Sequence, residues 1–414
     1  MKRHLLALLF CGATALAARS ADPAKDYFFQ PGDRILFLGD SITEQLQYTN
    51  DIELYLTSRF PGANFFFLNA GIGGDTAHGG ANRFKAQVLD EKPSKVTINF
   101  GMNDAGYGKF NPSANRAFIE KTNAMLKMAK DAGVRVALLS PNAVDPRVKS
   151  NGAEYVETQK QFYAPLATCA SEFGFPYVDQ YGITRAAQDR MAQDDPKAAK
   201  AKPYYDGFHT SPPGAMLMAH AILTGLKSPA LVSQATMDAA AAQASGTECT
   251  VSDLKASASG VSFQRLDKAL PWALEKDWLP MLPYTNQLKD LNWYGLKVAG
   301  LKEGDYAVRI DGEEVARFTA AELAEGVNLG NLTTGSVWKH GQELFKAIEA
   351  KNRLVHDRFR GVHLASIPNW LADVARERKP AELEKRLVQI TAAQAKVNEL
   401  AQPKAHAFEV AAVK

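Results

Sequence analysis

Short apolar runs alternate with longer amphipathic segments through the first half of the chain. The runs are rich in β-branched and aromatic residues, and each ends at a small or polar residue; they cover residues 34–38, 64–68, 96–100, 134–139 and 176–178. Their length and composition predict buried strands. The segments between them have helical periodicity. This alternation predicts βαβ units, and therefore a parallel sheet with helices on both faces.

The segment after the third run shows the helical pattern most clearly. One helical face is mostly apolar and is formed by Phe118, Thr122, Met125, Leu126 and Ala129. Charged residues occupy the other faces, and Gly133 follows as a helix terminator. We therefore expect one amphipathic helix here, packed against the predicted sheet.

The pattern changes in the second half of the chain. Residues 233–250 are rich in Ala, Ser and Gln and are interpreted as a helical tail or linker. Asp311-Gly312 lies between two alternating runs, which predicts a β-hairpin within a small antiparallel β unit. From about residue 336 the pattern is helical again. The expected organisation is a domain at 32–230, a small β unit at 251–330 and a helical region at 331–414.

The N-terminus has the three parts of a secretory signal. Residues 2–4 are basic, residues 5–18 form an apolar stretch, and Ala15-Leu-Ala17 offers a small-residue cleavage site. A signal peptide over residues 1–20 and a secreted or periplasmic protein are therefore expected, with no stable membrane anchor. The alternatives are a cytosolic protein with an apolar start, and a lipoprotein modified at Cys11, which the preceding Phe10 disfavours.

Composition narrows the classes of function. The chain has 414 residues, of which 46% are apolar and 22% charged, as in a globular protein of two or three domains. The net charge of +3 gives no reason to expect nucleic-acid binding. Cys169 and Cys249 lie outside the predicted signal and could pair in an oxidising compartment, although their number alone proves no disulfide. The chain contains no metal-binding motif, so no metal or cofactor is expected.

Polar motifs follow three of the predicted strands, at the edge where α/β sheets bind ligands. Ser41 follows the first strand and opens a helix, which would present its hydroxyl at this edge. A glycine-rich turn, 71–75, follows the second strand, and Asn103 follows the third with an amide that can donate to an oxyanion. Each motif has a simpler interpretation, respectively a helix cap, a plain turn and an Asx turn.

A fourth motif, Asp206-Gly-Phe-His209, directly precedes a predicted helix start at Ser211-Pro-Pro213. A nucleophilic serine needs a base, and the base needs a group that fixes its tautomer. Of eight histidines, only His209 has an acidic residue three positions earlier and a helix start directly after it. His78 lacks such a partner and is interpreted as a surface or substrate-side residue.

These four motifs, in this order, resemble the SGNH (GDSL-like) hydrolase superfamily over about residues 32–230. The resemblance implies a flavodoxin-like three-layer α/β sandwich with a parallel sheet. It also implies that Ser41 is the nucleophile, that His209 is the general base and then acid, and that Asp206 orients His209. The N–H groups of Ser41 and Gly73 and the side chain of Asn103 would form the oxyanion hole. Position 43 is Thr, so the wider nucleophile-elbow motif, with a second glycine there, is not met.

The resemblance defines the reaction better than the substrate. Superfamily members act on acetylated sugars, lipids, thioesters and small aryl esters. The segments near the expected site contain no long apolar loop, which favours short acyl groups. Their aromatic residues favour a saccharide ester; these are Tyr48, Tyr107, Phe110, Tyr204 and Tyr205. Trp293 and Tyr294 could line a sugar-binding surface or belong to a core.

We therefore expect a secreted serine esterase that removes short acyl groups, above all acetyl, from carbohydrate. One alternative is a lipid or thioester hydrolase of the same fold, similar to a lysophospholipase. Another is a secreted binding protein that keeps the fold without turnover. The sequence does not define an oligomeric state.

Overall fold

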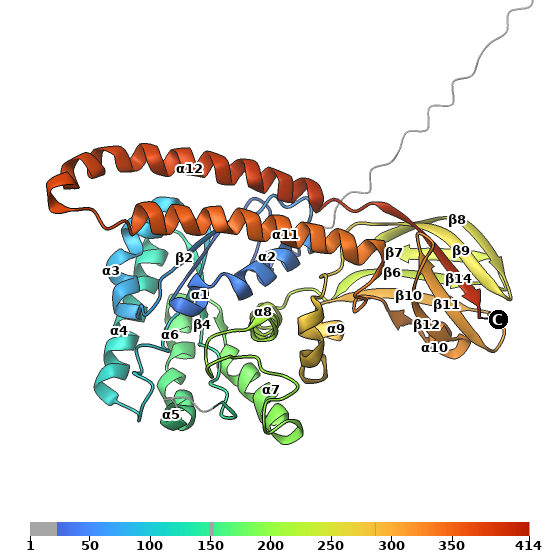
Figure 1. Ribbon diagram of the computed structural model, residues 1–414, viewed down its shortest axis with the longest axis horizontal. Coiled ribbons are helices and arrows are strands. Elements are labelled where there is room, and N and C mark those ends of the chain that lie inside the picture. Colours follow the sequence, from blue (N-terminus) through green and yellow to red (C-terminus); the bar gives the residue numbers. More distant parts are fainter. Residues whose placement is uncertain (1–22, 149–152, 286, 414) are drawn as a thin grey trace, which may run out of the picture.

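The computed structural model describes residues 23–148, 153–285 and 287–413. The predicted signal peptide, 1–20, lies outside the described residues. An α/β domain and a β sandwich lie side by side, and a long helical hairpin runs along the α/β domain (Figure 1). Within the described ranges, no helix has both the length and the apolar character needed to cross a membrane.

The first sheet has five parallel strands in the order β2-β1-β3-β4-β5. They are β1 (Arg34–Gly39), β2 (Phe66–Gly71), β3 (Lys95–Asn99), β4 (Arg135–Leu139) and β5 (Tyr177–Val178). Each of these strands overlaps one of the five predicted apolar runs, although β2 extends three residues beyond its run, and nearly all of the strand residues are buried. The order is that of flavodoxin-like folds, and it brings the carboxyl ends of β1, β2 and β3 together.

Helices connect and cover these strands. They are α1 (Ser41–Glu44), α2 (Gln47–Arg59), α3 (Ala77–Gln87), η1 (Leu89–Glu91), α4 (Pro112–Asp131), α5 (Ala153–Tyr163), α6 (Leu166–Phe173), α7 (Gln180–Asp194) and α8 (Pro212–Gly225). Helix α2 packs against α8, whereas α3 packs against α4, and α4 against α6. The buried residues of α4 are the five of the predicted apolar face. The predicted three-layer α/β fold is confirmed.

Two further sheets form the β unit and share one apolar core. Their strands are β6 (Leu231–Asp238), β7 (Gln243–Thr247), β8 (Cys249–Ser257), β9 (Gly260–Asp267), β10 (Trp293–Ala299), β11 (Asp305–Ile310), β12 (Glu313–Thr319), β13 (Val327–Asn328) and β14 (Ala405–Ala412). Short helices are inserted between them, namely η2 (Lys276–Tyr284), α9 (Gln287–Asp290) and α10 (Ala320–Glu325). Asp311 and Gly312 both have positive φ, of 51° and 83°, which confirms the predicted hairpin turn.

The helical interpretation of residues 233–250 is wrong. This segment forms most of β6 and the whole of β7, which pair with each other. β6 buries Val232, Ala235 and Met237 in the sandwich core, and it also pairs with β10. Burial and pairing in the sheet therefore override the helical propensity of an Ala-rich composition.

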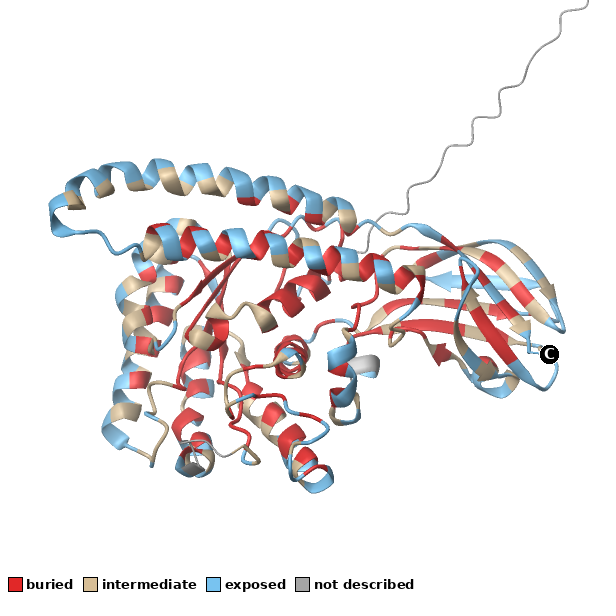
Figure 2. Ribbon diagram, viewed as in Figure 1, coloured by how far each residue is buried: buried red, intermediate tan, exposed pale blue. Residues whose placement is uncertain are grey.

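The last part of the chain joins both halves of the molecule. Helix α11 (Gly335–Arg358) continues through a π-helical turn, η3 (Phe359–His363), and a short η4 (Asn369–Leu371) into α12 (Ala372–Leu400). Figure 2 shows a buried stripe along α11. On this stripe, fully buried Lys351 pairs with fully buried Glu53 of α2 at 2.8 Å. The region expected to be helical ends in strand β14, which lies between β9 and β11 of the β unit.

Candidate active site

Ser41, His209 and Asp206 form one hydrogen-bonded chain. Ser41 Oγ lies 2.8 Å from His209 Nε2, although the two residues are 168 positions apart. His209 Nδ1 lies 2.6 Å from Asp206 Oδ2. A proton on Nδ1, donated to the carboxylate, leaves Nε2 free to accept the proton of the serine hydroxyl. The structure thus brings together the three residues that the sequence predicted as nucleophile, base and orienting acid.

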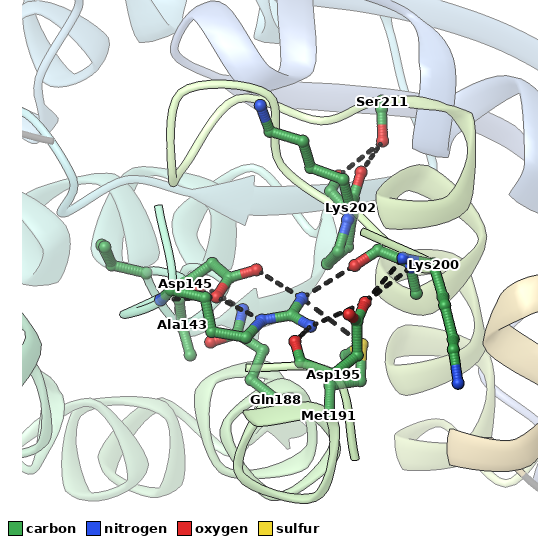
Figure 3. A network of polar contacts seen from close by, with 12 residues as sticks. Ala143, Asp145, Gln188, Met191, Asp195, Lys200, Lys202 and Ser211 are labelled. Atoms are coloured by element: carbon green, nitrogen blue, oxygen red, sulfur yellow. Dashed lines mark hydrogen bonds and ion pairs between the residues drawn. The ribbon is translucent and has the colours of Figure 1, made fainter. Parts of the chain in front are cut away.

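The loop before α8 holds the histidine in place. Asp206 Oδ1 accepts the backbone N–H groups of Phe208 and His209, at 3.1 and 2.8 Å. Partial burial acts to raise the pKa of Asp206, but the hydrogen bonds from His209 and Phe208 outweigh it and hold this pKa below its usual value. Ser211 closes the loop, because its Oγ donates to the carbonyl oxygen of Lys202 at 2.7 Å (Figure 3).

Two glycines allow α1 to lie directly against the ends of β1 and β2. A Cβ atom at Gly39 would lie 2.2 Å from Thr43 Oγ1, and one at Gly71 would lie 2.3 Å from the backbone N of Glu44. Neither site has room for a side chain. These glycines therefore position the helix that begins with Ser41.

The predicted oxyanion donors Gly73 and Asn103 follow β2 and β3 as expected. The N–H of Gly73 donates to Glu44 Oε2 at 2.6 Å. The amide of Asn103 donates through Nδ2 to the carbonyl oxygen of Asp75 at 2.9 Å, and its Oδ1 accepts the hydroxyl of Tyr107 at 2.6 Å. Tyr107 therefore fixes the orientation of the Asn103 amide. An oxyanion at Gly73 would compete with the Glu44 carboxylate.

Glu44 also connects the site to the C-terminal helices, a link that the sequence did not predict. Its other oxygen, Oε1, lies 3.1 Å from Arg360 Nε and 3.5 Å from His356 Nε2. Both partners come from the end of α11 and the turn that follows it. The glycine loop is therefore coupled through one carboxylate to a segment about 300 residues away in the sequence.

Two carboxyl groups with shifted acidity adjoin site residues in the chain: Asp40, before Ser41, and Asp104, after Asn103. Burial raises the pKa of Asp40 to about 7, with smaller contributions from the charges of Asp104 and Asp75. Burial likewise raises the pKa of Asp104 to about 7. Neither was predicted as a catalytic residue, although their position at strand ends beside site residues was a usable signal; Asp40 caps α1, because its side chain accepts the N–H of Ile42.

A buried arginine joins three loops next to the site. Arg147 donates to both carboxylate oxygens of Asp145, at 3.0 and 2.8 Å, and to the carbonyl oxygens of Asp195 and Ala201. Its partners Asp145 and Asp195 are labelled in Figure 3. The side chains of Arg147 and Asp145 are 2% and 0% exposed. The N–H of Asp145 donates to the carbonyl oxygen of Gly207, inside the catalytic loop. Arg147 is therefore a positioning residue that the sequence analysis missed.

Aromatic rings surround the imidazole of His209. Tyr205 stacks on it with ring centroids 5.8 Å apart, and Phe208 lies 4.7 Å away on a tilted ring. Tyr205 is 52% exposed, so part of its ring faces solvent. Other predicted aromatic residues of the site are core residues instead, because Tyr48 and Tyr204 are fully buried.

Other candidate residues lie away from the triad. His78 is exposed on α3 and contacts Asn82. Tyr294 is buried in the β unit, as the core interpretation predicted. Cys169 and Cys249 are both buried and unpaired, so the possible disulfide is not formed. Among the described residues, no group of three or more His, Cys, Asp or Glu side chains could hold a metal ion.

Comparison with known proteins assigns this part of the chain to a family. Residues 37–217 match the model of the GDSL-like lipase/acylhydrolase family. The match covers less than half of the chain, and over these residues it confirms the predicted resemblance to the SGNH (GDSL-like) hydrolases.

Two curated proteins match parts of the chain. Esterase TesA of Pseudomonas aeruginosa is 29% identical over 165 residues, which cover 39% of this chain and 75% of that protein. The uncharacterized lipoprotein YqeF of Bacillus subtilis is 33% identical over 104 residues, which cover 24% of this chain and 41% of that protein. The second match thus spans less than half of the relative's length.

One solved structure is similar over almost the whole chain. It is that of a gut microbial diltiazem-metabolizing enzyme, with a TM-score of 0.79 and 23% sequence identity. The similarity covers 96% of this chain and 100% of that one. The shared fold therefore extends beyond the hydrolase domain to the β unit and the helical hairpin.

Proposed function

We propose that this protein is an exported serine esterase that removes short acyl groups, above all acetyl, from carbohydrate. The observation that carries the proposal is the chain of hydrogen bonds from Ser41 through His209 to Asp206. It lies in a domain of the lipase/acylhydrolase family. The N-terminal signal pattern of residues 1–20 supports export to the periplasm or beyond.

The proposed mechanism has two half-reactions. His209 Nε2 takes the hydroxyl proton of Ser41 while Oγ attacks the ester carbonyl, and Asp206 stabilises the imidazolium that forms. His209 then returns this proton to the leaving alcohol, which leaves an acyl group on Ser41. In the second half-reaction, a water molecule attacks the acyl group with His209 again acting as base and then as acid, and the carboxylic acid is released. The oxyanion is bound by the N–H groups of Ser41 and Gly73 and by the Asn103 amide.

For Gly73 to act as an oxyanion donor, its N–H must exchange the Glu44 carboxylate for the substrate oxygen. Arg360 already contacts the other oxygen of Glu44. A small rotation of the Glu44 side chain toward Arg360 would keep the carboxylate paired and release the N–H. Arg360 and Glu44 would then act together as a substrate-responsive part of the site.

The substrate preference rests on the surroundings of His209. The half-exposed ring of Tyr205, stacked on the imidazole, offers a flat surface suited to the apolar face of a sugar. The polar and aromatic segments beside the triad suit a short acyl group. A lipid or thioester hydrolase remains the competing enzyme class, and a binding protein without turnover is the competing non-enzyme class.

The test is hydrolysis of the p-nitrophenyl esters of acetate and octanoate by the wild type and by Ser41→Ala. The proposal predicts preference for acetate, no turnover by Ser41→Ala, and release of acetate from acetylated oligosaccharides by the wild type. Preference for octanoate would favour the lipid hydrolase. Activity that survives in Ser41→Ala would contradict the mechanism, and a complete absence of activity would favour the binding protein.

A further inference from the structure

A cavity of about 300 Å³ lies where α2, α8, η2 and α11 meet. It is assembled from three parts of the sequence: the segment just after Ser41, the η2 segment of the β unit, and helix α11. Gln47 and Asp51 come from the first part, Glu275 and Trp278 from the second, and Glu349 from the third. The cavity therefore exists only because the accessory regions pack against the hydrolase domain.

The cavity contains buried acceptor atoms without donors. Asp51 is 2% exposed, and its Oδ2 has no hydrogen-bond partner among the described residues. Gln47 Oε1 is likewise buried and unpartnered within that part of the chain. Buried acceptors are normally paired, since leaving them unpaired destabilises the fold. Gln47 and Asp51 both line the cavity, so a ligand there that supplies N–H donors would compensate for the unpaired acceptors of these side chains.

The charges of the cavity favour a cationic ligand. Burial, followed by the charges of Glu275 and Glu349, raises the pKa of Asp51 well above its ordinary value. Arg353 also lines the cavity, but its side chain is exposed, and no ion pair joins it to these carboxylates among the described residues. The three acidic groups therefore gain most from a positive charge placed between them.

The apolar wall of the cavity is aromatic. Trp278 is 1% exposed and Phe345 is 7% exposed, and their ring centroids lie 6.3 Å apart in an edge-to-face arrangement. Aromatic faces attract organic cations, most strongly where water is excluded. The indole N–H of Trp278 is buried and also lacks a partner in the described structure.

One wall of the cavity adjoins the catalytic loop. Gln45 lines the cavity, and its Oε1 accepts the hydroxyl of Thr210, the residue after His209, at 3.0 Å. Its Nε2 donates to the hydroxyl of Tyr205 at 3.2 Å. Pro212, at the start of α8, also lines the cavity. A ligand held here would lie against the residues that carry the triad.

We propose that this cavity binds a protonated organic amine, with Asp51, Glu275 and Glu349 as its counter-ions and Trp278 and Phe345 as its aromatic wall. The amine is either part of the alcohol portion of an ester substrate or a separate molecule. Binding itself does not depend on the proposed esterase function, because none of these residues takes part in the acyl transfer.

The direct test is calorimetric titration of the full-length Ser41→Ala protein with n-butylammonium, and with 1-butanol as a neutral analogue. We expect binding of the ammonium ion and none of the alcohol.

Asp51→Asn removes a desolvated counter-charge and should weaken binding by about 30-fold or more. Glu349→Gln should weaken it as well, and it serves as a second variant should Asp51→Asn fail to fold. Asp131→Asn, which removes an exposed acid on α4 away from the cavity, is the control and should bind as the parent does.

Inhibition of p-nitrophenyl acetate hydrolysis in the wild type distinguishes an amine that is part of the substrate from an amine that is a separate molecule. Competitive inhibition by n-butylammonium would make the cavity a subsite for substrate, whereas binding without competition would make it a site for a separate molecule. If n-butylammonium binds but the wild type shows no esterase activity, the proposed esterase function is rejected and the amine-binding proposal stands. The proposal is overturned if n-butylammonium does not bind, or if Asp51→Asn and Glu349→Gln both leave its affinity unchanged.

Discussion

The Arg147 network and the acidic cavity both contain a buried carboxyl group, but only the carboxyl group of the Arg147 network is paired. The guanidinium of Arg147 meets both oxygens of Asp145 and two backbone carbonyl oxygens. Asp51 Oδ2 meets no donor in the described structure. A fully paired buried charge positions the loops around it, whereas an unpaired buried carboxyl group costs stability, and we expect it to be retained where it binds a ligand. The two regions should therefore respond to mutation with opposite signs.

The largest effect is expected at the triad. Asp206→Asn keeps an oxygen to accept the backbone N–H groups of Phe208 and His209 but can no longer stabilise the imidazolium. The account predicts a fall in kcat of about 10⁴-fold with p-nitrophenyl acetate and little change in the melting temperature. Asp131→Asn, at the exposed end of α4, is the control. Near-normal turnover by Asp206→Asn would show that the hydrogen bond to His209 does not serve catalysis.

Removal of the Arg147 side chain should destabilise the protein strongly. Arg147→Met leaves Asp145 buried without its counter-charge, and loss of one partner of a buried pair costs about 3–5 kcal/mol. Urea unfolding measures the change, and activity should fall with it because Asp145 holds the carbonyl oxygen of Gly207. A stability equal to that of the wild type would mean that the network does not anchor the catalytic loop.

The buried carboxyl of Asp104 should make stability depend on pH. Its folded-state pKa, about 7, is raised above the unfolded value of about 4, so the folded state binds the proton more tightly. This contribution is fully present below about pH 4 and is lost as the pH rises through about 7. Asp104→Asn should flatten the fall in melting temperature over this window, and Asp40 and Asp51, whose pKa values are also raised, contribute to the slope that remains. An unchanged pH profile would contradict the assignment.

The smallest effect, and the one of opposite sign, is expected at Asp51. Burial disfavours the ionised form of the Asp51 carboxyl group, and Asp51→Asn removes this group. The substitution should therefore raise the free energy of unfolding by about 0.5–2 kcal/mol. Urea unfolding at neutral pH, beside Arg147→Met, gives the contrast directly. Destabilisation by Asp51→Asn would mean that this carboxyl group serves the fold, and the difference between the two regions would disappear.

Local patterns explain what could be predicted from the sequence. The five parallel strands are short apolar runs, and α4 has a clear helical face. Asp206 and His209 lie three residues apart, so a single loop is enough to bring their side chains together. Ser41, Gly73 and Asn103 each follow a strand, and the parallel sheet carries all three to one edge. The motifs therefore encode most of the candidate site.

The remaining features depend on contacts between distant segments. Strand β6 forms because it pairs with β7 and β10, and the Ala-rich composition of this segment does not predict that pairing. Strand β14 closes a sheet that begins about 150 residues earlier. The Arg147 network joins three loops, and the cavity around Asp51 joins α2, η2 and α11. Hydrophobic periodicity carries no information about such partners, so these features became visible only in the structure.

The most direct test identifies the residue that acts as the nucleophile. The full-length protein is treated with a serine-directed fluorophosphonate, and the adduct is located by intact-mass and peptide mass spectrometry. The account predicts a single adduct on Ser41, lost in Ser41→Ala and strongly slowed in Asp206→Asn. A stable adduct on another residue, or ester hydrolysis that continues when Ser41 is blocked, would contradict it.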